Sequence, residues 1–170
     1  MKHVEVDVFL SIGSNIDRHW HISHALDDLR QQFGVITCSR VYESEAIGFS
    51  GQSFFNFAAG FSTRLEAREV KRLLREIEIK HGRKADAAKF ESRTLDIDLL
   101  AYGNQVVTDG DLMLPHPDLT RYAFMLEPLA EIAPDYVHPL LGRTYQELWD
   151  NFDLDRVRPT AVALDWQISE

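Results

Sequence analysis

The chain has 170 residues, a net charge of −9 and one cysteine, Cys38. This length suits a single domain over 1–170, and 45% hydrophobic with 26% charged residues is typical of a globular protein with a real core. The negative charge argues against a general binder of nucleic acid or anionic membranes, and one cysteine excludes an internal disulfide. No signal peptide is evident, and no apolar run reaches the ~18 residues of a membrane helix. We therefore expect a cytoplasmic protein.

The first half of the chain alternates strand and helix patterns. Apolar and polar residues alternate from 4 to 11, which predicts a strand, and apolar residues recur at helical spacing from 20 to 33. A strand-like run over 35–42, a loop over 44–53 and an aromatic strand over 54–61 follow. This half is therefore expected to be β-α-β-β.

The second half adds one more helix and strand before a C-terminal extension. Apolar residues at i, i+3, i+4 and i+7 predict a helix over 70–77, and a strand with two aspartates follows it. Residues 102–105 predict a hairpin turn into Val106-Val107, and 123–132 and 144–152 predict short helices. The order β-α-β-β-α-β predicts an α+β, ferredoxin-like fold: an antiparallel sheet with helices packed on it and a C-terminal extension.

The strand that begins near Leu95 carries the strongest candidate for chemistry. In a strand, side chains alternate between faces, so Asp96 and Asp98 share one face while their apolar neighbours fill the other. Two unpaired carboxylates this close repel one another, and Mg²⁺ removes that repulsion. The pair also fits an ordinary amphipathic strand with a polar outer face.

The residues before this strand are basic. From 64 to 94, ten Lys or Arg and six acidic residues give a local charge of +4 in an otherwise acidic chain. Part of this charge belongs to a solvated helix face, but the part from Arg83 to Arg93 is not helical in pattern. Cations that converge on a metal site indicate a polyphosphate ligand.

Two further groups of aromatic side chains stand out. Phe54 and Phe55 are adjacent on a strand and must face opposite sides, so either a planar aromatic ligand or a second hydrophobic layer covers one of them. His19, His21 and His24 do not share a helix face, and we interpret them as surface residues and not a zinc site. His116 lies in a rigid Pro-His-Pro segment, where a structural and a functional role are equally compatible with the sequence.

Several short motifs occur in an order that resembles a known family. The motifs are Ile12-Gly13-Ser14-Asn15, Asn56, Gly82-Arg83, Arg93-Thr94-Leu95-Asp96-Ile97-Asp98, Tyr102-Gly103-Asn104, Pro115-His116-Pro117 and Phe124-Met125-Leu126-Glu127-Pro128-Leu129. Over roughly residues 8–135 the chain resembles the 6-hydroxymethyl-7,8-dihydropterin pyrophosphokinases of folate biosynthesis. This resemblance implies the ferredoxin-like core already expected from the element order.

The resemblance implies an enzyme that transfers pyrophosphate from ATP. The hydroxymethyl oxygen of the pterin attacks the β-phosphorus, and AMP leaves. By the same resemblance Asp96 and Asp98 hold two Mg²⁺ ions, and Arg83 and Arg93 join them as catalytic residues. The implied ATP contacts are Arg83, Lys89, Arg93, Leu99, His116 and Arg121. The implied pterin contacts are Ser44, Glu45, Ile47, Phe54, Asn56, Phe90, Asp96 and Phe124.

The chain departs from the family pattern beside the triphosphate. Lys89-Phe90-Glu91-Ser92 stands where the family usually has Arg-Trp-Gly-Pro, Ala85 replaces an arginine, and Tyr122 replaces another with Arg121 one step away. Lysine lacks the bidentate fork of arginine, so several phosphate contacts are weakened.

Two alternatives therefore stay open. The first is a pterin- or nucleotide-binding paralogue with weak or altered activity. The second is a module like the RNA-recognition domains, which share the element order but not this acidic composition. We expect a monomer that acts on a pterin and ATP and binds neither nucleic acid nor membrane.

Overall fold

The computed structural model describes residues 4–44, 53–82, 95–153 and 160–161. In chain order the elements are β1 (Val6–Ser14), α1 (Arg18–Phe33), β2 (Thr37–Cys38), β3 (Tyr42–Ser44), β4 (Phe54–Thr63), α2 (Ala67–Lys80), β5 (Asp96–Tyr102), β6 (Val107–Asp109), β7 (Leu112–Leu114), a short 3₁₀ helix (Pro117–Thr120), α3 (Ala123–Ile132), α4 (Tyr145–Asp150) and β8 (Thr160–Ala161).

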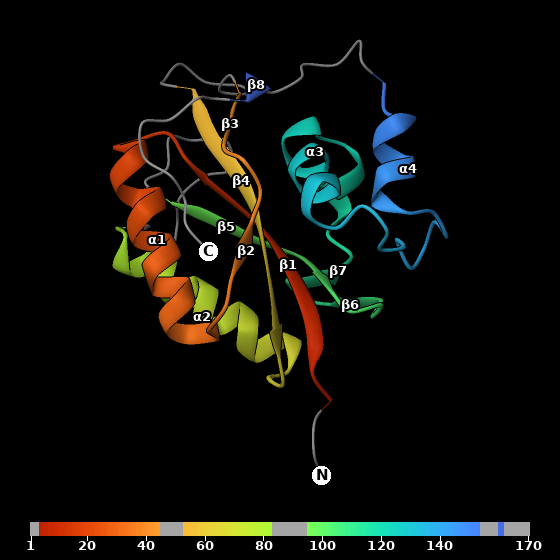
Figure 1. Ribbon diagram of the computed structural model, residues 1–170. Helices are drawn as coiled ribbons and strands as arrows, with labels where there is room; N and C mark the ends of the chain where they lie inside the picture. The colour runs from red at the N-terminus through yellow and green to blue at the C-terminus, as the bar shows by residue number, and fades with distance from the viewer. Residues whose placement is uncertain (1–3, 45–52, 83–94, 154–159, 162–170) are drawn as a thin grey trace.

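One antiparallel sheet organises these elements (Figure 1). Its strand order is β5-β1-β4-β3-β8, with β2 also paired to β4, so β5 forms one edge. The β-α-β-β-α-β order and the antiparallel sheet confirm the predicted α+β, ferredoxin-like fold. Among the described residues, no helix is both long enough and apolar enough to cross a membrane.

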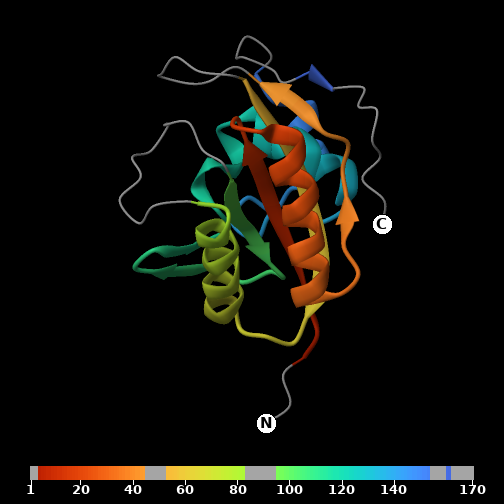
Figure 2. The ribbon, with the colours of Figure 1, turned by 90° about the vertical axis from the view of Figure 1, so that its left-hand side faces the viewer.

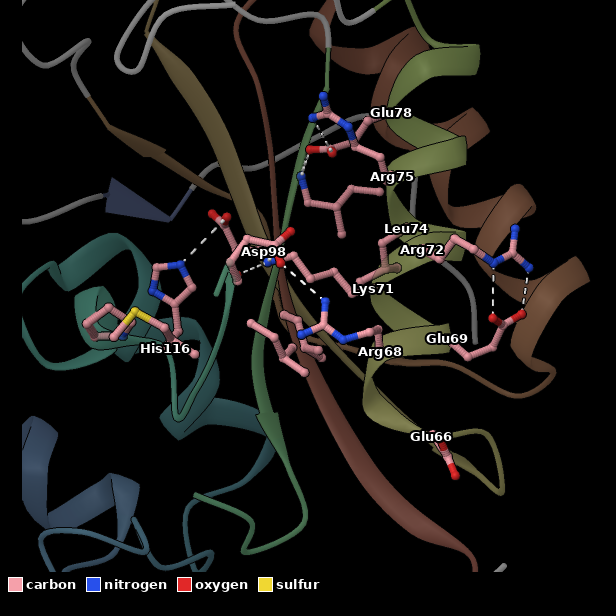
Figure 3. A pocket seen from close by; sticks show the side chains of 16 residues that line it. Glu66, Arg68, Glu69, Lys71, Arg72, Leu74, Arg75, Glu78, Asp98 and His116 are labelled. Carbon is pink, nitrogen blue, oxygen red and sulfur yellow. Dashed lines mark hydrogen bonds and ion pairs between the residues drawn. The ribbon is translucent and has the colours of Figure 1, made fainter. Parts of the chain in front are cut away.

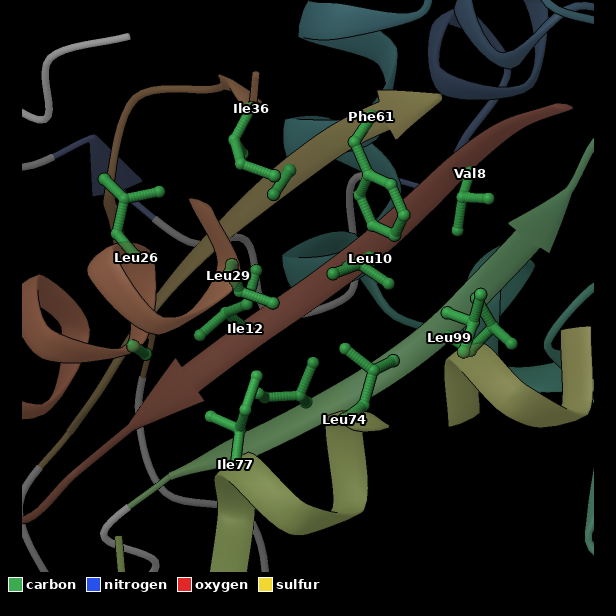
Figure 4. Close-up of a cluster of buried hydrophobic side chains, with 14 of the residues drawn as sticks. Val8, Leu10, Ile12, Leu26, Leu29, Ile36, Phe61, Leu74, Ile77 and Leu99 are labelled. Atoms are coloured by element: carbon green, nitrogen blue, oxygen red, sulfur yellow. The ribbon is translucent and has the colours of Figure 1, made fainter. Parts of the chain in front are cut away.

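The helices cover both faces of the sheet. α1 and α2 lie side by side on one face (Figure 2), and α3 with α4 lies on the other (Figure 1). Alternate residues Val8, Leu10 and Ile12 of β1 point toward α1 and α2, where they pack with side chains such as Leu29 and Leu74 (Figure 4). A second apolar cluster fills the space under α3 and includes Phe9, Leu100, Met125, Leu126 and Leu129. Period-two alternation in the strands therefore produces two separate cores.

The strand predicted over 35–42 is divided into β2 and β3. At the break, Ser39 donates its backbone N–H to the Ala58 carbonyl at 2.9 Å, and its hydroxyl oxygen accepts the Ala58 N–H at 2.8 Å. The Ser39 hydroxyl thus takes the place of a backbone acceptor for the Ala58 N–H, and both short strands stay paired to β4.

The predicted hairpin after Tyr102 is wrong in its pairing. A turn follows β5, but β6 pairs with β7 in a separate two-stranded sheet. The hairpin turn is instead at Gly110-Asp111, where Gly110 has φ 62° and the next pair is Asp109 with Leu112. A glycine at the first position of a two-residue loop is typical of a type II′ turn, and this signal lies after β6, not before it.

The surface interpretation of the N-terminal histidines is correct for His19 and His24 but wrong for His21. His21 is buried, and its Nδ1 lies 2.8 Å from Nδ1 of His81 at the end of α2. Burial, followed by the nearby His81 ring, lowers the pKa of His21. The spacing within α1 could not reveal this contact because His81 is 60 positions away in the sequence.

Candidate active site

The register of three strands brings the predicted metal and pterin residues together. Gly13 of β1 pairs with Asn56 of β4 on one side and with Asp96 of β5 on the other. Ser11, two residues earlier, pairs with Asp98. Paired residues point to the same side of an antiparallel sheet, so the amide and both carboxylates share one face.

Gly13 makes room for the Asn56 amide. A Cβ on Gly13 would lie 2.6 Å from Asn56 Oδ1 and 3.7 Å from Phe54 Cδ1, so the amide rests directly over the β1 backbone. Asn56 is only 4% exposed, and its Nδ2 donates to the Ser44 hydroxyl at 2.8 Å. The amide is therefore held in one orientation by β3 and β1 together.

The aromatic strand separates its rings as predicted. Phe55 and Phe57 are buried in the core under α1 and α2, whereas Phe54 is half-buried on the opposite face with Asn56. Phe124, in the first turn of α3, is half-buried too, and its ring centroid is 5.3 Å from that of Tyr122. Because α3 packs on the same sheet face, both predicted pterin-stacking residues belong to elements on that side.

A groove of about 970 Å³ runs along β5 between α2 and the β6–β7 hairpin (Figure 3). Three residues with predicted roles line it: Asp98, Leu99 and His116. The side chains of α2 that line the other wall include four cations, Arg68, Lys71, Arg72 and Arg75. The described lining also includes five carboxylates, those of Glu66, Glu69, Glu78, Asp98 and Asp111. The groove therefore offers a polyphosphate several cations but no net positive charge.

His116 is fixed at the mouth of this groove. Its backbone N–H donates to the Leu100 carbonyl at 2.8 Å, and its Nδ1 accepts the Asp118 N–H at 3.1 Å. Since Nδ1 accepts, the proton of a neutral ring lies on Nε2, which is 3.8 Å from Asp98 Oδ1. The ring is thus oriented to donate toward Asp98 or toward an anion beside it.

The carboxylate pair fits a magnesium site. Asp96 and Asp98 are half-buried, and the Asp98 side chain, 29% exposed, opens on the groove. One or two carboxylates beside substrate phosphates are the usual protein ligands of Mg²⁺. In the part of the chain that the structure describes, no group of three or more His, Cys, Asp or Glu side chains could hold a metal.

Several predicted site residues are not placed by this structure. Outside the described residues lie Glu45, Ile47, Arg83, Lys89, Phe90 and Arg93. Arg121 is described: its side chain is 62% exposed and pairs with Asp118 at 3.3 Å. It is not among the described residues that line the groove.

Sequence reasoning missed the part of the site that α2 contributes. Lys71 and Arg75 line the groove four residues apart on one side of the helix. Glu78 is a buried acid whose carboxylate accepts the Ile97 N–H at 2.9 Å. The sequence does contain a signal for Glu78. Glu78 follows Leu74 by four residues, which places a charged side chain beside the apolar side of the helix, where a solvated residue is not expected.

The chain is similar to a family model and to several known proteins. The family model described as 7,8-dihydro-6-hydroxymethylpterin-pyrophosphokinase (HPPK) matches residues 9–134. A protein of Aquifex aeolicus named 2-amino-4-hydroxy-6-hydroxymethyldihydropteridine pyrophosphokinase is 36% identical over 142 residues, which cover 82% of this chain and 88% of that protein. A Synechocystis protein of the same name is 38% identical over 128 residues, covering 75% of this chain and 65% of its own.

Solved structures share the fold. The wild-type HPPK-DHPS chain of Plasmodium falciparum matches with a TM-score of 0.66 at 14% identity, over 88% of this chain and 45% of that chain. The same wild type with pterin and p-hydroxybenzoate gives a TM-score of 0.68 at 14% identity, over 88% and 43%. This chain therefore spans less than half of those proteins, and at such identity the likeness concerns the fold alone. Family model, relatives and fold agree: the chain belongs to the 7,8-dihydro-6-hydroxymethylpterin-pyrophosphokinase family.

Proposed function

We propose that this chain transfers pyrophosphate from ATP to the hydroxymethyl group of 6-hydroxymethyl-7,8-dihydropterin and releases AMP, in folate biosynthesis. The observation that carries the proposal is the register across Gly13, which sets the Asn56 amide and the Asp96 carboxylate on either side of one backbone position. Asn56, which is proposed to hydrogen-bond to the edge of the heterocycle, and Asp96, which is proposed to bind a metal, are then neighbours. A hydroxymethyl group on that heterocycle would lie beside a metal-bound triphosphate.

Asp96 and Asp98 would hold two Mg²⁺ ions. When bound, such ions neutralise the charge of the triphosphate and of the attacking oxygen. The protein's own task is then to position the two substrates, because phosphoryl transfer needs alignment and electrostatic stabilisation more than covalent help.

In the proposal ATP occupies the groove along β5. The backbone groups of Leu99 point to the same side of this edge strand as those of Ile97, because residues two apart face alike. The backbone N–H and C=O of Leu99 are therefore suited to hydrogen-bond to the edge of the adenine base. His116 lies beside Asp98, where it is suited to contact the phosphates. Arg83, Lys89, Arg93 and Arg121 are proposed as further phosphate contacts, with Arg83 and Arg93 catalytic.

The pterin is proposed to stack between Phe54 and Phe124, with Asn56 reading its ring edge. Asn56 suits this role because Ser44 accepts one of its amide hydrogens, which fixes the orientation of the amide. Glu45, Ile47 and Phe90 are proposed as further pterin contacts. Stacking on aromatic side chains and hydrogen bonds to the ring edge are the general means by which proteins select a flat heterocycle.

The proposal also covers the setting of the reaction. It has the chain act as a monomer in the cytoplasm, on two small molecules and not on nucleic acid or membranes. The net charge of −9 supports the second part, because an acidic chain is repelled by the phosphates of nucleic acids and by anionic membranes.

The test is the nucleotide formed when the protein is incubated with ATP, Mg²⁺ and 6-hydroxymethyl-7,8-dihydropterin. We expect AMP, and no AMP when the pterin or Mg²⁺ is left out. Binding of the pterin with no AMP in any mixture would contradict the transferase and identify a binding paralogue.

A further inference from the structure

Glu78 is a buried acid to which the proposed reaction gives no part. It lies on α2, is 4% exposed, and follows Leu74 by one helical turn. A buried carboxylate is costly unless hydrogen bonds and an opposite charge compensate it. Its position beside the apolar side of the helix therefore calls for a specific role.

Among the described residues, two of the contacts that Glu78 makes compensate this charge. Glu78 Oε2 accepts the backbone N–H of Ile97 at 2.9 Å, and Oε1 lies 3.9 Å from Arg75 Nη1 (Figure 3). Arg75 is 39% exposed and lines the groove, so the ion pair is partly solvated and weak. The hydrogen bond to Ile97 is the buried contact of the two.

Ile97 is the residue between the two predicted metal ligands. It belongs to β5, the edge strand of the described sheet, where one side of the backbone has no neighbouring strand. Glu78 takes the place of that strand for the Ile97 N–H. Further along the same strand, the Leu100 carbonyl is likewise taken by the His116 N–H.

We propose that Glu78 is a positioning residue for the metal pair. Its carboxylate fixes the backbone at the midpoint between Asp96 and Asp98, and so fixes the direction in which both carboxylates leave the strand. It acts through Ile97 and not as a ligand. The inference rests on the proposed function of Asp96 and Asp98, but the contact itself can be measured without any substrate.

Two substitutions separate the effect of the length of the Glu78 side chain from the effect of its charge. Glu78→Gln keeps an acceptor oxygen at the same distance and removes the charge, whereas Glu78→Asp keeps the charge and withdraws the oxygen by one methylene. Glu76→Gln on the same helix is the control, because Glu76 is 57% exposed and pairs only with the exposed Arg72 among its described contacts.

Three readouts are needed. Amide hydrogen exchange at Ile97 reports the contact in the free protein, and the electron-paramagnetic-resonance titration of Mn²⁺ in the presence of a non-hydrolysable ATP analogue reports the metal pair. Steady-state kcat and KM report the reaction. Far-UV circular dichroism and the melting temperature establish that each variant is folded.

We expect Glu78→Asp to exchange the Ile97 amide faster, to bind Mn²⁺ more weakly and to lose about 10- to 100-fold in kcat with little change in the KM for pterin. Glu78→Gln should stay within a few-fold of the parent in all three. If Gln is impaired and Asp is not, or if Ile97 exchange is the same in every variant, the positioning role is wrong. A parent protein that forms no AMP would refute the proposed function, while the exchange and Mn²⁺ measurements would still decide the role of Glu78.

Discussion

Among the described residues, the proposed reaction depends most on Asp98, a proposed metal ligand. Its carboxylate opens on the groove, 3.8 Å from the His116 ring. Asp98→Asn keeps the size of the side chain and removes the charge on which the proposed metal binding depends. We expect kcat for AMP formation to fall by about 10²–10³, or about 3–4 kcal/mol.

The control for this variant is Asp109→Asn, an exposed aspartate that pairs with Arg68. It should leave kcat unchanged because surface ion pairs contribute little. If Asp98→Asn keeps more than about a tenth of the parent activity, against the loss expected from one preorganised charge, the carboxylate pair does not hold the metal.

Gly13 has a role that depends on having no side chain. Gly13→Ala would place a Cβ 2.6 Å from Asn56 Oδ1, a distance that the amide can relieve only by moving. We expect the Kd for pterin to rise while the Kd for ATP hardly changes, as measured by calorimetry. In an Asn56→Ala background the same substitution should cost much less, since residues in contact are not additive. An equal cost in both backgrounds would show that Gly13 acts independently of the amide.

The neighbours Phe54 and Phe55 provide a matched pair of variants. Phe54→Ala should weaken pterin binding by about 1–3 kcal/mol, the magnitude for bases stacked on aromatic rings, with little change in melting temperature. Phe55→Ala should instead destabilise the fold by about 3–5 kcal/mol, because Phe55 is a core residue. Phe124→Ala should resemble Phe54→Ala, with weaker pterin binding and little change in melting temperature. Equal destabilisation by Phe54→Ala and Phe55→Ala would place both rings in the core.

At the scale of elements, a polar cluster joins α1 to α2 across their apolar contact. His81 Nε2 lies 3.0 Å from Asp28 Oδ2, and Lys80 donates to Asp28 Oδ1 at 2.7 Å. Burial opposes ionisation of Asp28, but the hydrogen bonds from Lys80 and His81 outweigh it and lower its pKa. In the 2.8 Å contact between His21 and His81, one ring nitrogen must donate and the other accept, so at least one ring is neutral.

This cluster makes stability depend on pH. The pKa of His21 in the folded protein lies below its ordinary value of 6.5, so as pH falls the unfolded chain binds its proton first. The contribution of His21 is therefore complete above that value and is lost as pH falls through the folded pKa. We expect the melting temperature to fall as the pH drops below about 6.5, the ordinary pKa of histidine.

Two variants check this assignment. His21→Asn should flatten the drop in melting temperature, although the buried His138, whose pKa burial also lowers, should leave part of it. His24→Gln should keep the full drop, because His24 is exposed. If both variants melt with the same pH dependence, the α1–α2 cluster is not the source.

At the scale of the whole molecule, the sequence predicts those features whose signal is local. The alternation in β1 and the helical spacing in α2 follow from nearby residues, and so does the opposite orientation of Phe54 and Phe55. The carboxylate pair is predicted because period two places residues i and i+2 on one face. These features needed no knowledge of the tertiary structure.

Contacts between distant elements could not be predicted in this way. His21 meets His81 across 60 positions, and Glu78 reaches Ile97 on another element. The hairpin predicted after β5 is wrong because the sequence contains two turn signals, at 102–105 and at Gly110-Asp111. Only the strand pairing in the folded protein distinguishes between them. The roles of individual site residues rest on the motif resemblance, whereas the register across Gly13 shows that three of those motifs lie side by side on neighbouring strands.

The most direct test of pyrophosphoryl transfer is the ³¹P NMR spectrum of the complete reaction. Transfer forms the bond from the hydroxymethyl oxygen to the β-phosphorus and breaks the bond from that phosphorus to the oxygen that stays with AMP. We expect equal amounts of AMP and a pterin diphosphate, and formation of both about 10²–10³ times more slowly with Asp98→Asn. ADP with a pterin monophosphate, or ADP and phosphate formed whether or not the pterin is present, would contradict it.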